Sequence, residues 1–78
     1  MLLEVTMLNS QDVLFEGMAR SVIVPGEQGT FEVLPFHKRL LSRLVMGDVQ
    51  IDESVFSIHR GVIKVNQNKV SIIAEGAT

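Results

Sequence analysis

The side chains best suited to catalysis or metal binding in this sequence are its two histidines, His37 and His59. They lie far apart along the chain, and the chain contains no cysteine. A zinc site needs three or four ligands at workable spacing, which two isolated histidines do not supply. We therefore expect neither a metal nor a cofactor, and we interpret both histidines as surface or partner-contact residues.

The other polar residues form no catalytic constellation. The candidate serine nucleophiles are Ser21, Ser42 and Ser54. None of them lies in the context of a nucleophile elbow, so a Ser-His-Asp site is not expected. The carboxylates Asp48, Asp52 and Glu53 lie near a predicted hairpin tip, where a solvated turn is more common than an acid–base pair. The sequence therefore indicates a protein that is not an enzyme.

The segment Gly26-Glu27-Gln28-Gly29 has the GxxG spacing with which KH domains clamp a nucleic-acid backbone. In KH domains that loop joins two helices and usually carries basic residues, whereas this one joins two predicted strands and carries Glu27. The net charge of −2 also disfavours phosphate binding, which needs clustered lysine and arginine. There is no Walker or GxGxxG loop. We predict no nucleic-acid partner.

A basic group follows Pro35 and consists of Lys38, Arg39 and Arg43. One interpretation is a solvated face. The other is a contact with an acidic protein surface. The residues alone leave both interpretations open.

The chain has 78 residues, which correspond to one domain. Its apolar fraction of 46% argues against disorder. A domain of this size buries only about 60–65% of its unfolded surface, so a partner protein could supply the missing burial. No apolar run is long enough to span a membrane, and no signal peptide is recognisable. We therefore expect an intracellular protein.

Short segments with strand character alternate with turn signals along the whole chain. In residues 1–8, the side chains of Leu3, Val5 and Met7 can share one face of a strand. Further strands are predicted at residues 13–18, 20–24, 30–34, 49–51, 55–58, 62–65 and 69–74. This spacing predicts an antiparallel β-sandwich or a flattened barrel.

Several positions modify this pattern. Gly17 lies inside a predicted strand and suggests a bulge or bend. Residues 36–46 have leucines at helical spacing but no clear N-cap, so we expect a turn of helix that leads into a strand. Gly47-Asp48 predicts a turn, and residues 66–68 predict a hairpin turn in which asparagine takes the left-handed conformation. Residues 75–78 form a predicted polar tail.

Five pieces of the sequence, in register, resemble the ε subunit of bacterial F-type ATP synthases. Residues 21–35 read SVIVPGEQGTFEVLP, close to a family run of the form SVxxPGxxGxFxVLP. The other pieces are the Val5 strand, residues 13–17 (VLFEG), His37 with Leu40 and Leu41 and the following Gly47, and the closing segments 61–65 and 70–75. The resemblance covers nearly the whole chain, although many members continue into two C-terminal helices.

Three departures from the family pattern lie close to the predicted contacts. Pro35-Phe36-His37 stands where the family has Pro-Gly-His. Lys38-Arg39 replaces the family's Ala-Pro, and His59-Arg60-Gly61 replaces its Ser-Gly-Gly. These departures place additional basic residues in a region that the family uses for contacts.

The resemblance implies an all-β fold for residues 1–78, namely an antiparallel β-sandwich of two sheets with about ten short strands. It implies a non-catalytic subunit of the central stalk, or rotor, that binds the γ subunit and the c-ring and helps couple ion translocation to ATP synthesis. Such a subunit would be peripheral to the cytoplasmic face of the bacterial inner membrane. The alternative from the residues alone is a stand-alone β-sandwich module that binds a ligand or peptide.

The resemblance also assigns contact residues. The predicted c-ring contact comprises Gly26, Glu27, Gln28, Gly29, Thr30 and Glu32. The predicted contact with the γ subunit comprises His37, Lys38, Arg39, Leu40, Leu41, Ser42, His59 and Arg60.

Overall fold

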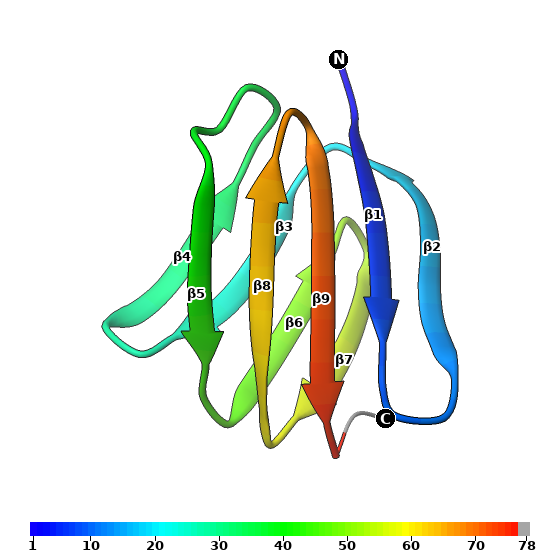
Figure 1. The fold of residues 1–78 in the computed structure, drawn as a ribbon, viewed down its shortest axis with the longest axis vertical. Coiled ribbons are helices and arrows are strands. Elements are labelled where there is room, and N and C mark those ends of the chain that lie inside the picture. The colour runs from blue at the N-terminus through cyan, green and yellow to red at the C-terminus, as the bar shows by residue number, and fades with distance from the viewer. Residues whose placement is uncertain (77–78) are drawn as a thin grey trace.

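The computed structural model describes residues 1–76, which form nine strands and contain no helix (Figure 1). The strands are β1 (Leu3–Leu8), β2 (Val13–Ala19), β3 (Val22–Gly26), β4 (Gly29–Val33), β5 (Leu40–Leu44), β6 (Gly47–Ile51), β7 (Ser54–Ile58), β8 (Arg60–Asn66) and β9 (Lys69–Glu75). Of the predicted C-terminal tail, Glu75 ends β9, and Ala77 and Thr78 lie outside the described residues.

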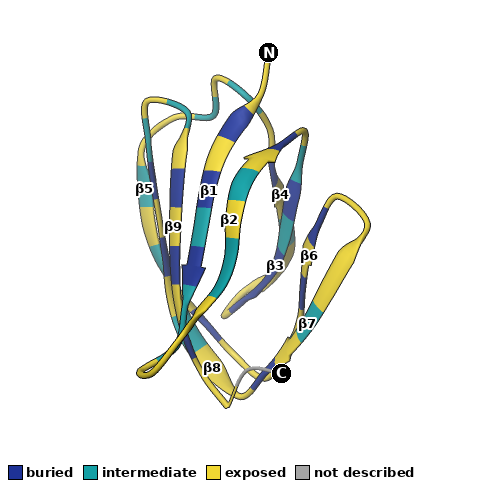
Figure 2. Cartoon of the chain, turned by 90° about the vertical axis from the view of Figure 1, so that its right-hand side faces the viewer, coloured by how far each residue is buried: buried dark blue, intermediate teal, exposed yellow. Residues whose placement is uncertain are grey.

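The strands form one hydrogen-bonded path that folds over on itself into two layers. The order is β2-β1-β9-β8-β5-β3-β6-β7, and β4 pairs with β3. The front layer of Figure 1 contains β2, β1, β9, β8 and β5. Strands β4, β3, β6 and β7 lie behind them, as the side view in Figure 2 also shows. The layers are joined where β5 meets β3 at a single residue pair, Leu44 with Gly26. This arrangement confirms the predicted all-β sandwich.

Alternation along the strands places the apolar core between the two layers. Leu3, Val5 and Met7 are all completely buried, as their spacing predicted. The other buried apolar residues are Ala19, Val22, Val24, Val33, Leu44, Val49, Ile51, Ile58, Ile63, Val65, Val70, Ile72 and Ala74. Within residues 1–76, no polar or charged residue is buried, so the core is entirely apolar.

One strand pairing departs from the antiparallel pattern. β1 and β9 run parallel, with Val5 beside Val70 and Met7 beside Ile72, whereas all the other paired strands are antiparallel. The two strands are the first and the last of those in residues 1–76. Parallel neighbours cannot be joined by a tight hairpin, so this pairing is entirely a long-range contact.

The prediction for residues 36–46 is confirmed only in its second half, because strand β5 lies there but no turn of helix leads into it. Leu40, Ser42 and Leu44 point inward, and Leu41 and Arg43 are exposed. Five residue pairs with β8 hold this strand, so long-range pairing overrides the local helical spacing of the leucines.

Two other local predictions are wrong. A turn was expected at Gly47-Asp48, but the chain bends one residue earlier, and Gly47 already begins β6. The bulge expected at Gly17 lies elsewhere in β2: the register shifts so that Leu14 is the extra residue, while Gly17 pairs regularly with Val5. Gly17 instead leaves room beside the ring of Phe15, which would lie 3.7 Å from a Cβ at this position.

Candidate partner-contact surfaces

The residues predicted to contact a c-ring lie mainly at the tip of the β3–β4 hairpin. Gly26 pairs with Gly29, so the exposed residues Glu27 and Gln28 form a two-residue turn. Gly29 has φ of +124°, a conformation that is open to glycine and strained for other residues. A short turn therefore presents Glu27 and Gln28 to the solvent.

Thr30 and Glu32 extend this surface along the exposed side of β4. β4 pairs only with β3, so it is an edge strand. A hollow of about 390 Å³ is lined partly by Glu27 of the hairpin tip and partly by residues of β5, β8 and β9. A second hollow, of about 460 Å³, joins residues 26–31 to Ser42 of β5. The structure thus brings two residues predicted for γ, Ser42 and Arg60, to hollows beside the loop predicted for the c-ring.

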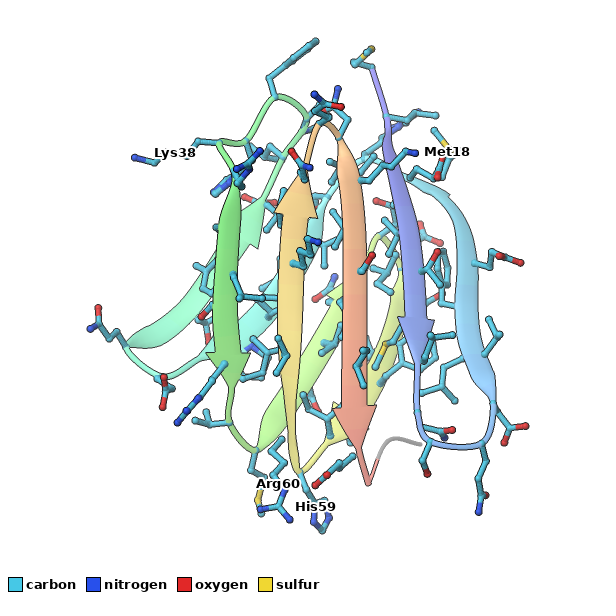
Figure 3. All side chains as sticks on the ribbon, in the orientation of Figure 1. Met18, Lys38, His59 and Arg60 are labelled. Atoms are coloured by element: carbon cyan, nitrogen blue, oxygen red, sulfur yellow. The ribbon has the colours of Figure 1, made fainter. Side chains whose placement is uncertain are left out.

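The main part of the predicted γ contact lies at the other end of β5. The loop before this strand is closed by a hydrogen bond from the backbone N–H of His37 to the carbonyl oxygen of Leu34, with 3.1 Å between N and O. Nδ1 of His37 lies 2.8 Å from the carbonyl oxygen of Lys38. Lys38 points away from the body of the sandwich at the upper end of Figure 3. These bonds hold the start of the basic group in a defined loop.

His59 and Arg60 lie at the opposite end of the β5–β8 pair from Lys38 (Figure 3). The β5–β8 register runs from Leu40 beside Val65 to Leu44 beside Gly61. Four residue steps along a strand correspond to about 13 Å, to which the loops add further separation. The residues predicted for γ therefore form two groups rather than one cluster.

Arg60 contacts Glu75 and shares a hollow with Glu27, and neither residue was predicted to be its neighbour. Its Nε donates a hydrogen bond to a carboxylate oxygen of Glu75, and both side chains are exposed. The backbone N–H of His59 donates to the carbonyl oxygen of Glu75, with 2.9 Å between N and O. Arg60 also lines the 390 Å³ hollow that contains Glu27, the tip residue of the β3–β4 hairpin.

A strip of outward-facing side chains connects the two groups. It consists of Leu41 and Arg43 on β5 and Val62 and Lys64 on β8, and we call it the outer strip. Leu41 pairs with Lys64, and Arg43 pairs with Val62, so the four residues are direct cross-strand neighbours. Ile73 of β9 lies beside Val62 and extends the apolar part of this face.

Three further surface residues, Val62, Lys64 and Ile73, were not predicted from the sequence. The signal that could have found them is the period of two in residues 62–74. Because Ile63 and Ile72 are buried, their neighbours Val62 and Ile73 must point to the opposite face of the sheet.

No charged side chain of residues 1–76 is buried. Residues 1–76 contain no group of three or more His, Cys, Asp or Glu residues that could hold a metal ion. In the same part of the chain, no helix is long and apolar enough to cross a membrane. What the structure offers is two exposed loops and the outer strip between them.

Comparison with known families decides the assignment of the chain. The sequence profile described as "ATP synthase, Delta/Epsilon chain, beta-sandwich domain" matches residues 2–78. The chain belongs to this family. The predicted resemblance is thereby confirmed, and the two-layer fold agrees with the family's description as a β-sandwich.

Relatives of known name support membership in the delta/epsilon family. The ATP synthase epsilon chain of Sulfurimonas denitrificans is 40% identical over 80 residues, which cover 96% of this chain and 62% of that protein. The ATP synthase epsilon chain of Campylobacter lari is 35% identical over 81 residues, which cover 97% of this chain and 62% of that protein. The chain thus spans about 62% of the length of these relatives.

Solved structures with the same fold come from rotary assemblies. A chain in the mitochondrial ATP synthase of Euglena gracilis, solved as OSCP/F1/c-ring, superposes with a TM-score of 0.86 at 18% identity, over 99% of this chain and 52% of that one. A chain in the central stalk/c-ring of the Tetrahymena thermophila mitochondrial ATP synthase gives 0.80 at 15% identity, over 97% of this chain and 65% of that one. At these identities, the similarity establishes the fold.

Proposed function

We propose that this chain is the β-sandwich part of a bacterial ATP synthase ε subunit and serves as a non-catalytic component of the rotor. It binds the γ subunit and the c-ring and helps couple ion translocation to ATP synthesis. The observation that carries this proposal is the family match over residues 2–78. The absence of buried charged residues within the described chain fits a contact role.

In this proposal the two exposed loops have different partners. The β3–β4 tip, with Glu27 and Gln28 as its exposed turn, faces the c-ring. The loop that contains Lys38 and Arg39 faces γ. The outer strip then continues the γ contact towards Arg60, so that one elongated partner can reach both groups. The subunit is peripheral to the cytoplasmic face of the bacterial inner membrane.

Reversal of the basic pair tests the proposal. The variant Lys38→Glu with Arg39→Glu should bind the γ-containing assembly of its own complex more weakly than the wild type. The loss should be larger at low salt, because exposed charges at a rim act mainly through long-range attraction. Binding is measured by surface plasmon resonance with an assembly prepared without this subunit.

The matched control is Arg20→Glu, compared with the single variant Lys38→Glu, which changes the net charge equally. Arg20 precedes β3 and lines a hollow with Asp52 and Glu53 of the β6–β7 turn. Its affinity for the γ-containing assembly should be close to that of the wild type. If the Lys38 and Arg39 variant binds as tightly as the wild type at every salt concentration, the γ assignment of this loop is wrong.

The alternative of a stand-alone ligand-binding module has little support in the packing. Such a module needs an apolar groove with aromatic residues. The rings of Phe15 and Phe56 meet edge to face with 6.4 Å between centroids, and these two residues and Phe31 pack against the core. Phe36 is the one phenylalanine left on the surface of residues 1–76.

A further inference from the structure

Phe36 combines two unfavourable features. Its backbone has φ of +68°, in the left-handed region that favours glycine, and the residue is 76% exposed. An aromatic residue in this region is strained, and an exposed ring gains nothing from burial. Packing inside the sandwich therefore does not explain a phenylalanine at this position.

The surrounding residues hold Phe36 in this conformation. Its backbone N–H donates a hydrogen bond to Oδ1 of Asn68, with 2.6 Å between N and O. The next N–H, that of His37, donates to the carbonyl oxygen of Leu34. Asn68 itself has φ of +63° in the two-residue turn between β8 and β9. The turns before β5 and between β8 and β9 are thus joined to each other, and the ring of Phe36 remains outside them.

The neighbours of Phe36 indicate what kind of surface would cover it. Leu34, two residues earlier in the chain, is also exposed, so this loop carries two exposed apolar side chains. Lys38 and Arg39 follow two and three residues later and are both exposed. A complementary surface would have an apolar pocket with carboxylates at its rim. Because the loop is already ordered, little conformational entropy would be lost when it docks.

We propose that Phe36 is a preformed apolar anchor that inserts into an acid-rimmed pocket on the γ subunit. This inference rests on the proposed function, since γ is the partner assigned to this loop. Aromatic side chains that fill desolvated pockets dominate the affinity of many interfaces. The basic pair beside Phe36 steers association, and the ring limits dissociation.

The substitution Phe36→Gly distinguishes an effect on binding from an effect on stability. The affinity for the γ-containing assembly should fall, whereas the stability of the fold should rise. Glycine adopts φ of +68° without a Cβ penalty, so the melting temperature should rise. The affinity for the γ-containing assembly should fall at least tenfold, mainly through faster dissociation. Phe36→Trp keeps a large apolar ring and should retain most of the affinity.

The matched control is Val55→Ala, which removes exposed apolar surface from β7 in the other layer. Its affinity for the γ-containing assembly should equal that of the wild type. Phe36→Asn provides a second test, since asparagine tolerates the left-handed region better than most residues. It should also lose at least tenfold in affinity.

The outcomes distinguish the two proposals. If the wild type binds the γ-containing assembly and both Phe36→Gly and Phe36→Asn bind equally well, the anchor is overturned and the proposed function stands. If the wild type itself does not bind, the proposed function fails and the anchor fails with it. A tenfold loss in both variants, with Val55→Ala unchanged, supports the anchor.

Discussion

Ser21 and Asp52 exchange hydrogen bonds in both directions, although they are far apart in the sequence. The N–H of Ser21 donates to Oδ1 of Asp52 with 3.1 Å between N and O, and the N–H of Asp52 donates to the carbonyl oxygen of Ser21 at 3.2 Å. The N–H of Arg20 also donates to Oδ1 of Asp52, at 2.9 Å. Asp52 has φ of +51°. One carboxylate thus joins the β2–β3 connection to the β6–β7 turn.

Replacement of Asp52 should therefore destabilise the fold. Asp52→Ala removes the acceptor for two backbone N–H groups and places alanine in the left-handed region. We expect a loss of about 1–2 kcal/mol in the free energy of unfolding, measured by urea denaturation. The control Glu53→Ala, in the same exposed turn, should cost less than about 0.5 kcal/mol. Equal losses in the two variants would contradict this role of Asp52.

Ile72 and Ile73 are adjacent on β9 but face opposite sides of the sheet. Ile72 is 0% exposed and Ile73 is 59% exposed. Ile72→Ala should cost about 2–5 kcal/mol because it leaves a cavity between the layers. Ile73→Ala should stay within about 0.5 kcal/mol of the wild type. Thermal unfolding followed by circular dichroism compares them, and a reversed order would mean that the register of β9 is wrong.

Gly61 lies where β8 and β9 approach closely. A Cβ at this position would lie 2.6 Å from the carbonyl oxygen of Ile73, which is backbone and cannot move aside easily. Gly61→Ala should therefore cost about 1–3 kcal/mol in unfolding free energy. Gly17→Ala is the control, since its Cβ would meet only the ring of Phe15 at 3.7 Å. Chemical denaturation should show Gly17→Ala near neutral, and a tolerated Gly61→Ala would contradict the close approach.

The ion pair between Arg60 and Glu75 should contribute little to stability. The two side chains are 76% and 64% exposed, so solvent screens their attraction. A double-mutant cycle with Arg60→Ala and Glu75→Ala should give a coupling free energy of about 0.2–1 kcal/mol. The coupling should fall towards zero in about 1 M salt, where the Debye length is about 3 Å. A larger, salt-independent coupling would show that the pair has a structural role beyond surface attraction.

Most of the fold could be predicted because its signals are local. The alternation of Leu3, Val5 and Met7 fixes which face is apolar, whatever the strand pairs with. Asn68 takes the left-handed conformation, as its place in a predicted hairpin turn indicated. The helical spacing of the leucines in residues 40–45 was misleading, because the backbone of residues 40–44 pairs with β8 as a strand instead.

The contact surfaces were less predictable because they depend on which ends of distant strands meet. The sequence grouped His59 and Arg60 with Lys38 through a resemblance, but the β5–β8 register places them at opposite ends. Arg60 instead shares a hollow with Glu27. The partners of these residues stay predictions.

The amino-acid sequence by itself determined the family and most of the strands and turns, because alternation, glycine positions and turn residues act over a few neighbouring positions. Only the tertiary structure decided that β1 runs parallel to β9, that Asp52 ties two connections together, and that Phe36 is held outward with a positive φ. These features arise from hydrogen bonds between residues far apart in the chain. No local pattern specifies such bonds, since each becomes possible only when distant segments of the chain have come together.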